Sequence, residues 1–321
     1  MAVTAEQKTI SAPDAIVITG ATATGKSATG VAVAELLNGE IISLDSRQIY
    51  RGMDIGTAKP DAALRARVPH YGIDIADPDE GYSAGRFADD ARAWIADIQA
   101  RGKLPILVGG TGFFLKALTE PMFREPELPL SNRTELRAWL AARSTEDLQR
   151  WLGTIDPESA ESLRNAGGRQ RKTRALEIAL LTGHPIGWWH RLSPALEPPL
   201  TPLVFVLQLP RDQLYARINQ RVRDMIAAGL VREVEELLRC GYDQNAPGMN
   251  ATGYIELIPF LRGQVDLASA IDAIQRATRR YARRQETWFR HQLPAGAHML
   301  DARQSVSQLV ETIMDVWKAN Q

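Results

Sequence analysis

Residues 15–27 read AIVITGATATGKS, an apolar run that leads into a loop bounded by two glycines. The run Ala15 to Thr19 predicts a buried strand, and Ser27 to Leu37 predicts a helix that follows the loop at once. The loop matches G-x-x-x-x-G-K-[ST], and a strand before it with a helix after it is the context that this phosphate-binding motif requires. The segment therefore predicts a parallel α/β fold of the P-loop kind.

Each part of this loop has a chemical role toward phosphate. Two glycines let the backbone curl so that successive N–H groups point inward, and the helix adds its positive N-terminus. The lysine supplies a full charge, and the hydroxyl of Ser27 is predicted to ligate Mg²⁺. The predicted phosphate-binding residues are Gly20, Ala21, Thr22, Ala23, Thr24, Gly25, Lys26 and Ser27.

Apolar runs and helical patterns alternate along much of the chain, which is typical of a parallel sheet with helices on both faces. A clear helix is expected between Ser83, its predicted N-cap, and Gly102. Between Pro121 and Pro202 the pattern becomes helical, without clear strands. We therefore predict a P-loop core from residues 1–120 and 202–321, and a helical insertion domain from residues 121–201. The further predicted strands are Glu40 to Leu44, Tyr71 to Ile75, Leu104 to Val108 and Leu203 to Leu209.

Composition narrows the class of protein. The 321 residues are 45% apolar and carry equal numbers of acidic and basic side chains, 38 of each, so global charge does not indicate a nucleic-acid partner. Cys240 is the only cysteine, which excludes a disulfide framework and a cysteine-based zinc cluster. The first residues lack a signal peptide, and no apolar run approaches the ~20 residues of a membrane span. We expect a cytoplasmic protein.

Two features outside the loop bear on its chemistry. A P-loop ATPase carries an acidic Mg²⁺ ligand at the end of an apolar strand, but Leu104 to Val108 ends in Gly-Gly-Thr. This favours phosphate binding without ATP hydrolysis, although a small-molecule kinase remains open. Asp45 follows the second predicted strand, so it faces the same crevice as the loop. From position alone it is a general base, a metal ligand or a helix N-cap.

The sequence that follows Asp45, and several segments further along the chain, resemble one family. The segments DSRQIY at 45–50, GMDIGTAKP at 52–60 and VGGTG at 108–112 are similar to those of the tRNA dimethylallyltransferases. RALE at 174–177, TRRYARRQ at 278–285 and TWFR at 287–290 continue the resemblance in the same order. The Cys/His finger of eukaryotic members is absent, which indicates a bacterial-type member.

The resemblance implies a reaction and several residue roles. Family members transfer the dimethylallyl group of dimethylallyl diphosphate to the exocyclic amine of the adenine next to the anticodon on its 3′ side. Asp45 matches the family's base, and Thr111 and Arg221 match residues that contact the diphosphate. Arg217 lies one helical turn before Arg221 and is added from spacing alone. Mg²⁺ is the implied cofactor, and the chain is expected to be a monomer.

The tRNA partner is expected to meet several segments. The target base must leave the stacked anticodon loop, and such loops are read by stacking and base-edge contacts. An arginine stripe formed by Arg276, Arg280, Arg283 and Arg290 suits either phosphates or acidic neighbours. The resemblance implies contacts to the anticodon stem-loop from Asp45, Ser46, Arg47 and Gln48, and from Gln170, Arg171, Lys172, Thr173 and Arg174. Arg133 and Arg137, early in the insertion, are further candidates.

Three other functions account for part of these sequence features. A nucleoside kinase uses the loop and Asp45 but leaves the insertion without a role. An adenylate prenyltransferase shares the chemistry but takes a free nucleotide as acceptor. A non-catalytic tRNA-binding protein has no need of an intact phosphate loop.

Overall fold

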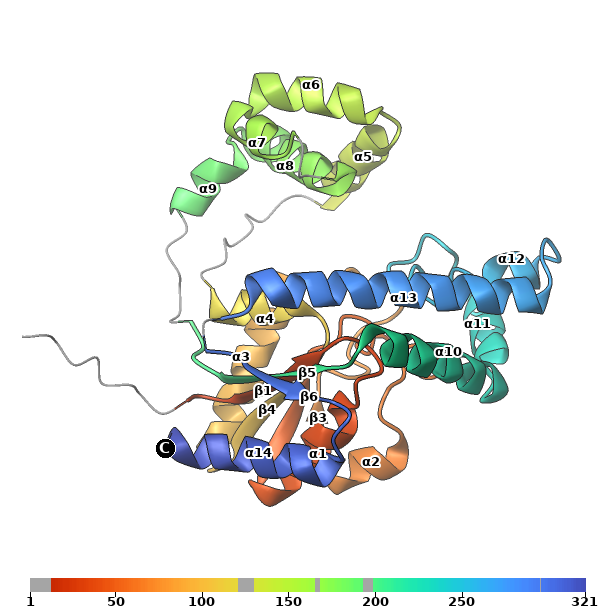
Figure 1. Cartoon of the computed structure of the whole chain (residues 1–321). Helices are drawn as coiled ribbons and strands as arrows, with labels where there is room; N and C mark the ends of the chain where they lie inside the picture. The colour runs from red at the N-terminus through yellow and green to blue at the C-terminus, as the bar shows by residue number, and fades with distance from the viewer. Residues whose placement is uncertain (1–12, 121–129, 165–167, 193–198, 295) are drawn as a thin grey trace, which may run out of the picture. The chain divides into compact units, whose positions relative to one another are not determined.

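The computed structural model describes residues 13–120, 130–164, 168–192, 199–294 and 296–321 (Figure 1). The chain forms two compact units. The first combines Met1–Thr119 with Leu200–Gln321, and the second is Glu120–Pro199. We describe each unit by itself.

The first unit is built on one sheet of six parallel strands in the order β3-β2-β4-β1-β5-β6. This confirms the predicted P-loop type of α/β fold. The first strand lies inside the sheet, so the loop that follows it opens at the middle of the sheet's edge. The strands are β1 (Ile16–Gly20), β2 (Gly39–Ser43), β3 (His70–Tyr71), β4 (Leu104–Gly109), β5 (Leu203–Gln208) and β6 (His298–Asp301).

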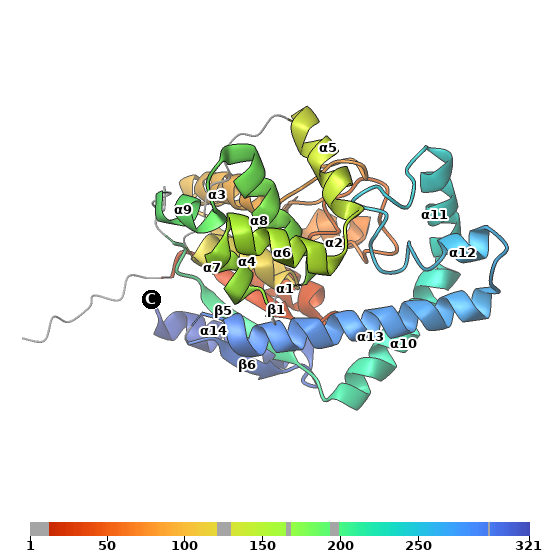
Figure 2. The same ribbon diagram turned by 90° about the horizontal axis from the view of Figure 1, so that it is seen from above.

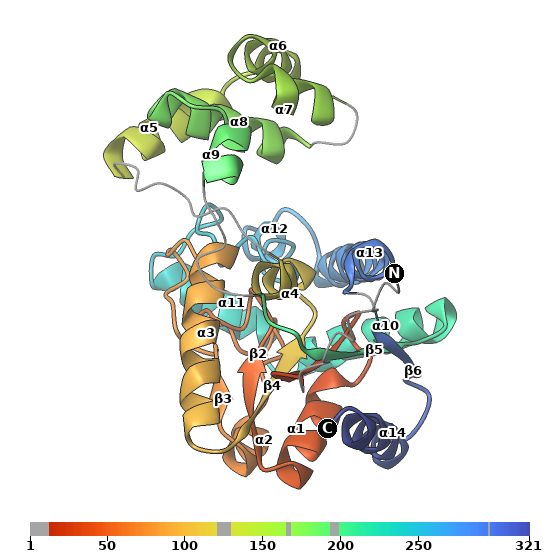
Figure 3. The same ribbon diagram turned by 90° about the vertical axis from the view of Figure 1, so that its left-hand side faces the viewer.

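Helices cover both faces of this sheet, as the near-continuous apolar strands require. Helices α1 (Lys26–Leu36) and α14 (Val306–Ala319) lie on one face, and α3 (Ala84–Ala100), α4 (Gly112–Thr119) and α13 (Leu267–Gln292) lie on the other (Figures 1 and 3). The main core is apolar on both sides of β1, where Ile16, Ile18 and Phe205 are fully buried.

The remaining helices of the first unit extend from the carboxyl end of the sheet. Figure 2 shows the long α13 running beside α10 and α12. These helices enclose a second apolar cluster with the loop that follows β2, centred on Met53, Tyr254 and Leu257. They are α10 (Arg211–Ala227), α11 (Leu230–Arg239) and α12 (Ile258–Leu261). The short α2 (Ala62–Arg67) is the exception, because it contacts α1 and its Leu64 packs against the main core.

The second unit contains helices and no strand among its described residues. Its own small core is formed by Leu140, Leu148, Leu152 and Leu176 with two alanines. The helices are α5 (Leu130–Ala141), α6 (Thr145–Ile155), α7 (Pro157–Ser162), α8 (Arg169–Thr182) and α9 (Ile186–Leu192).

Two sequence predictions of strands need correction. The predicted strand from Tyr71 to Ile75 is wrong for most of its length, because the chain turns at Gly72 and Asp74, both of which have positive φ angles. Strand β6 was missed, since it is four residues long and mostly not buried. By contrast, Ser83 caps α3 by accepting a hydrogen bond from the Arg86 amide, as predicted. No helix in the described part of the chain is both long and apolar enough to cross a membrane.

Candidate active site

Strand register brings three sequence motifs to one level of the sheet. Ile18 of β1 pairs with Val108 of β4, and Val108 pairs with Ser43 of β2. Two residues further along each parallel strand stand Gly20, Gly110 and Asp45. Because adjacent strands lie about 4.8 Å apart, β1 and β2 are separated by about 10 Å, with the Gly-Gly-Thr turn between them. The phosphate loop and Asp45 therefore border one crevice.

The phosphate loop has the curled backbone that its sequence predicts. Gly20 has a φ of 143°, and a Cβ atom there would lie 2.4 Å from the Leu207 carbonyl oxygen. The hydroxyl of Thr24 donates to the Ala21 carbonyl at 2.9 Å, and the Lys26 ammonium donates to the same carbonyl at 2.6 Å. The lysine head group is thus held against the loop.

Two cations and one carboxylate lie together at this crevice. Burial and the nearby charge of Arg221 lower the pKa of Lys26 to about 7. The Asp45 carboxylate opposes this shift. Burial also lowers the pKa of Arg221, against the raising effect of Asp45. The site carries more positive than negative charge in a desolvated place, which suits a diphosphate.

Asp45 closes a turn and does not cap a helix, because the residues that follow it form a turn. One carboxylate oxygen accepts the Arg47 backbone N–H at 2.9 Å, which closes a tight turn. Burial raises the pKa of the Asp45 carboxyl, with the Arg47 amide and Lys26 opposing the shift. A half-buried carboxylate with a raised pKa is a better proton acceptor than a solvated one, as a general base requires.

Thr111 joins the Gly-Gly-Thr turn to the turn that begins at Asp45. Its hydroxyl accepts the Ser46 backbone N–H at 3.0 Å, and its own N–H donates to the Leu44 carbonyl at 2.9 Å. Tyr281 lies beside Thr111, and burial with the nearby Asp45 charge raises the pKa of the Tyr281 hydroxyl to about 12.

Sequence analysis assigns no role to Tyr281, although this residue lies in one of the motifs that carry the family resemblance. Its position beside Asp45 depends on the docking of α13, which contacts β1 across more than 200 residues of chain. A local signal existed. Tyr281 and Gln285 are uncharged, lie one turn apart among arginines, and so mark a covered face of that helix.

Arg47 and Gln48, which follow Asp45 in the sequence, make hydrogen bonds within the protein. The side-chain oxygen of Gln48 accepts from the Ser43 hydroxyl at 2.9 Å, and its amide nitrogen donates to the Ala58 carbonyl at 3.2 Å. The guanidinium of Arg47 donates to the Pro247 carbonyl at 2.8 Å. Gln48 thus supports the GMDIGTAKP loop at 52–60 in this structure.

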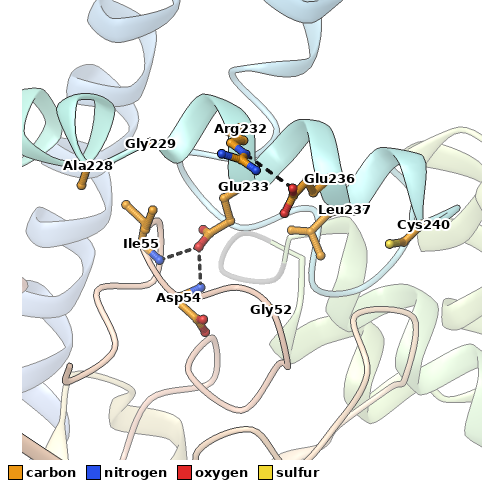
Figure 4. Close-up of a pocket in the computed structure, with 10 residues that line it drawn as sticks. All are labelled: Gly52, Asp54, Ile55, Ala228, Gly229, Arg232, Glu233, Glu236, Leu237 and Cys240. Carbon is orange, nitrogen blue, oxygen red and sulfur yellow. Dashed lines mark hydrogen bonds and ion pairs between the residues drawn. The ribbon is translucent and has the colours of Figure 1, made fainter. Parts of the chain in front are cut away.

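That loop is held from a second side by α11. The Glu233 carboxylate accepts the backbone N–H groups of Asp54, Ile55 and Gly56 at 2.8–3.1 Å, and it also accepts the Tyr254 hydroxyl at 2.6 Å. Figure 4 shows this carboxylate directed at the loop, at the edge of an open pocket between the loop and α11. Asp45 and the phosphate loop do not line this pocket.

Arg217 and Arg221 are one turn apart on α10 but differ in surroundings. Arg221 is half-buried beside Lys26 and Asp45. Arg217 is exposed, and its guanidinium donates to the Ala302 carbonyl at 3.4 Å, next to the end of β6. Arg221, which the resemblance implies, therefore lies beside Lys26 and Asp45, whereas Arg217, added from spacing alone, does not.

Ser27 has an exposed position in the first turn of α1. The described residues hold no group of three or more His, Cys, Asp or Glu side chains that suits a metal ion. Mg²⁺ usually keeps several waters and takes few protein ligands beside substrate phosphates. One serine hydroxyl at a phosphate loop fits that donor set.

In the second unit, three predicted RNA-contacting arginines share one carboxylate. Glu177 is buried and accepts Arg133 at 2.5 Å, Arg137 at 2.8 Å and Arg174 at 2.8 Å. These arginines keep the pKa of Glu177 low against its burial. The cluster has a net charge of two positive units by simple sum, so Glu177 gathers the arginines without neutralising them.

The rest of that RNA-binding prediction has a mixed outcome. Gln170 and Arg171 are exposed at the start of α8, and Thr173 is half-buried. Lys172 is 5% exposed, so its side chain does not present an ammonium group to solvent as the prediction requires. On α13, Arg280, Arg283 and Arg290 are exposed, whereas Arg276 pairs with Asp272.

Comparison with known proteins points to a single family. The family model described as IPP transferase matches residues 48–292, and the one described as isopentenyl transferase matches residues 13–68. The chain is 48% identical over 279 residues to the tRNA dimethylallyltransferase of Halorhodospira halophila, covering 86% of this chain and 89% of the relative. It is 45% identical over 280 residues to that of Chloroflexus aurantiacus, covering 86% and 92%.

Solved structures agree with this result. The tRNA isopentenylpyrophosphate transferase of Bacillus halodurans is 37% identical with a TM-score of 0.68, over 95% of this chain and 97% of that one. A eukaryotic dimethylallyltransferase described as acting on tRNA is 27% identical with a TM-score of 0.80, over 96% and 80%.

Proposed function

The chain belongs to the IPP transferase family of tRNA dimethylallyltransferases, and on that premise we propose how its residues carry out the reaction. The dimethylallyl group of dimethylallyl diphosphate passes to the exocyclic N6 amine of the adenine that is 3′-adjacent to the anticodon in tRNA. A carbon–nitrogen bond forms, the allylic carbon–oxygen bond breaks, and diphosphate leaves.

The diphosphate is bound by the loop from Gly20 to Ser27. Backbone amides of this loop, Lys26 and Arg221 face the oxygens on which negative charge grows as the carbon–oxygen bond breaks. Fixed cations and donors in a desolvated site are usually the largest single contribution to such catalysis. The placement of two basic side chains, Lys26 and Arg221, beside the single carboxylate of Asp45 supports this assignment.

Asp45 removes the proton from the amine. An exocyclic adenine amine is barely basic because its lone pair is delocalised into the ring, so its attack on the allylic carbon needs a proton acceptor within hydrogen-bond reach. Asp45 stands across the crevice from the phosphate loop, and its pKa is raised by burial. Thr111 holds the turn that follows Asp45 and is assigned a contact to the diphosphate.

Mg²⁺ is the proposed cofactor, with Ser27 as its protein ligand. When bound, the ion neutralises charge on the leaving diphosphate. We further propose that the protein acts as a monomer, and the tRNA substrate supports a cytoplasmic location.

The tRNA is bound by exposed arginines of both units. Arg137 and Arg171 of the second unit and Arg283 and Arg290 of α13 are exposed and suit phosphate contacts. The target adenine must leave its stack to reach Asp45. Gln48 and Arg47 line the turn at Asp45 and are assigned contacts with the anticodon loop.

The observation that carries this proposal is the common register of β1, β4 and β2. It brings the phosphate loop and Asp45 to the same edge of the sheet, with the Gly-Gly-Thr turn between them, which supports transfer from a diphosphate to an amine.

The direct test is to incubate the protein with Mg²⁺, dimethylallyl diphosphate and unmodified tRNA, and then to analyse the tRNA nucleosides by mass spectrometry. We expect prenylated adenosine at the position 3′ of the anticodon. Parallel reactions replace tRNA by AMP, or the prenyl donor by ATP with nucleosides. Prenylated AMP would indicate an adenylate prenyltransferase, and phosphorylated nucleoside without tRNA product would indicate a kinase.

A further inference from the structure

One face of α13 docks on the loops of the active site. Tyr281, Gln285 and Trp288 follow each other at intervals of four and three residues, so they share that face. Tyr281 lies beside Thr111, and the Trp288 ring covers Gly112, where a Cβ atom would lie 2.2 Å from the ring. Gln285 lies between them and is 6% exposed.

The side-chain amide of Gln285 joins two loops of the site. Its oxygen accepts the backbone N–H of Thr22 in the phosphate loop at 2.9 Å. Its nitrogen donates to the carbonyl of Gly110, in the turn that leads to Thr111, also at 2.9 Å. The N–H of Thr22 is therefore used within the protein, and the loop's shape at this point depends on a helix 263 residues away.

The two hydrogen bonds of Gln285 require a side-chain amide at this junction between the two loops. One end must accept from an N–H and the other must donate to a carbonyl. A carboxylate accepts at both ends and would face the Gly110 carbonyl oxygen, while an apolar side chain would leave both buried backbone groups unpaired. The junction is also closely packed, because a Cβ atom at Gly110 would lie 2.3 Å from the Gln285 nitrogen.

We propose that Gln285 is a positioning residue for the diphosphate cradle. Its two hydrogen bonds fix the distance between the phosphate loop and the Gly-Gly-Thr turn, and so hold the cradle at a set separation from Thr111 and Asp45. Phosphate oxygens must meet several loop amides at once, and misplacement of a loop by a fraction of an ångström weakens all of those contacts together.

The matched pair of variants is Gln285→Met and Gln275→Met. Gln275 lies on the same helix, is half-buried, and also donates to a backbone carbonyl, that of Asn219 in α10 at 3.2 Å. It touches neither loop of the site in the bonds that it makes. Methionine keeps the length of glutamine and removes both hydrogen-bonding atoms, so the pair separates anchoring of the helix from positioning of the cradle.

The readout is the affinity for inorganic diphosphate with Mg²⁺, measured by calorimetry on the full chain. The proposal rests on the proposed function, but this readout does not require any tRNA to be modified, so its failure is distinct from failure of the reaction assay. We expect Gln285→Met to bind diphosphate about tenfold more weakly, because the ligand must then order a loop that the parent protein already holds in place. Gln275→Met should bind within about twofold of the parent, since its bond lies outside the site.

A second variant, Gln285→Glu, keeps the test decisive if the methionine variant does not fold. The ionised glutamate repels the Gly110 carbonyl, whereas its protonated form has a donor and an acceptor again. Its affinity relative to the parent should therefore recover as pH falls, and a purely structural loss would not recover. Parent-like affinity in Gln285→Met, equal losses in Gln285→Met and Gln275→Met, or a pH-independent deficit in Gln285→Glu would each overturn the proposal.

Discussion

At the scale of single residues, Lys26 is the group whose protonation we expect to change when diphosphate binds. Its pKa of about 7 means that much of the free protein carries a neutral Lys26 above that pH. A bound diphosphate favours the charged ammonium and raises this pKa. Proton uptake on binding is therefore expected above about pH 7, and it fades at lower pH, where the ammonium is already formed.

Calorimetry of diphosphate binding at pH 8, in two buffers of different ionisation enthalpy, measures this uptake. The parent should take up about one proton more than Lys26→Met, since the ligand's own protons are common to both. Equal proton counts in the two proteins would show that Lys26 is charged before the ligand arrives.

How far single residues were predictable depended on whether their partners are close in sequence. Lys26 and Ser27 belong to one contiguous motif, and Asp45 follows a predicted strand, so their place at the sheet edge followed from local patterns. Gln285 and Tyr281 act through contacts made across most of the chain, which spacing along the sequence does not encode. The resemblance implies an RNA contact for Lys172 along with the rest of the segment 170–174, yet the packing of α8 buries its side chain.

At the scale of elements, β2 is anchored at the end opposite the active site. Glu40, whose side chain is 1% exposed, accepts from Arg101 and Lys103 at 2.6 Å and from the Tyr71 hydroxyl at 2.9 Å. The Arg101, Lys103 and Tyr71 hydrogen bonds lower the pKa of Glu40 to about 2, against its desolvation. This network ties β2 to β3 and to the end of α3.

Glu40→Gln should therefore lower the free energy of unfolding by about 2 kcal/mol at pH 7, a value reduced for the partial exposure of the partners. A depressed carboxyl pKa stabilises the fold fully above its ordinary value of 4.5, and this stabilisation is lost as pH falls toward about 2. Urea unfolding at pH 7 and at pH 3 measures the difference, with Glu35→Gln, an exposed partner of Arg67, as control. A deficit equal at both pH values would contradict the ionic origin.

Long elements were predicted better than short ones. Strands β1, β2, β4 and β5 and helix α3 have strong apolar patterns, and each was placed within one or two residues. The two-residue β3 and the half-exposed β6 form because neighbouring strands offer hydrogen bonds at the sheet edges, a condition that no local pattern reports.

At the scale of the whole molecule, a net charge of zero leaves no long-range attraction for tRNA. Affinity must then come from local arginine groups, such as the cluster that Glu177 holds together. The slope of log Kd against log salt concentration counts the phosphates that these groups neutralise.

Arg137→Ala and Arg171→Ala should each reduce the magnitude of that slope by about 0.7–0.9. Arg150→Ala is the control, because Arg150 is exposed on the same unit but is assigned no tRNA contact, and its pair with Asp147 has no net charge. Filter binding of unmodified tRNA over a range of salt concentrations gives the slopes. An unchanged slope in both test variants would remove these residues from the tRNA-binding surface.

The central claim is that Asp45 and the phosphate loop act on the two sides of one reacting carbon. The most direct measurement is the single-turnover rate of prenyl transfer by Asp45→Asn, with donor and tRNA bound at saturating concentrations that equilibrium titration has verified. Loss of the general base predicts a rate about 10²–10⁴-fold below the parent, with both affinities within a few-fold. The same account predicts that the parent rate falls as pH drops through the raised pKa of Asp45, and that Asp45→Asn lacks this fall. Transfer by Asp45→Asn at a parent-like rate would contradict it.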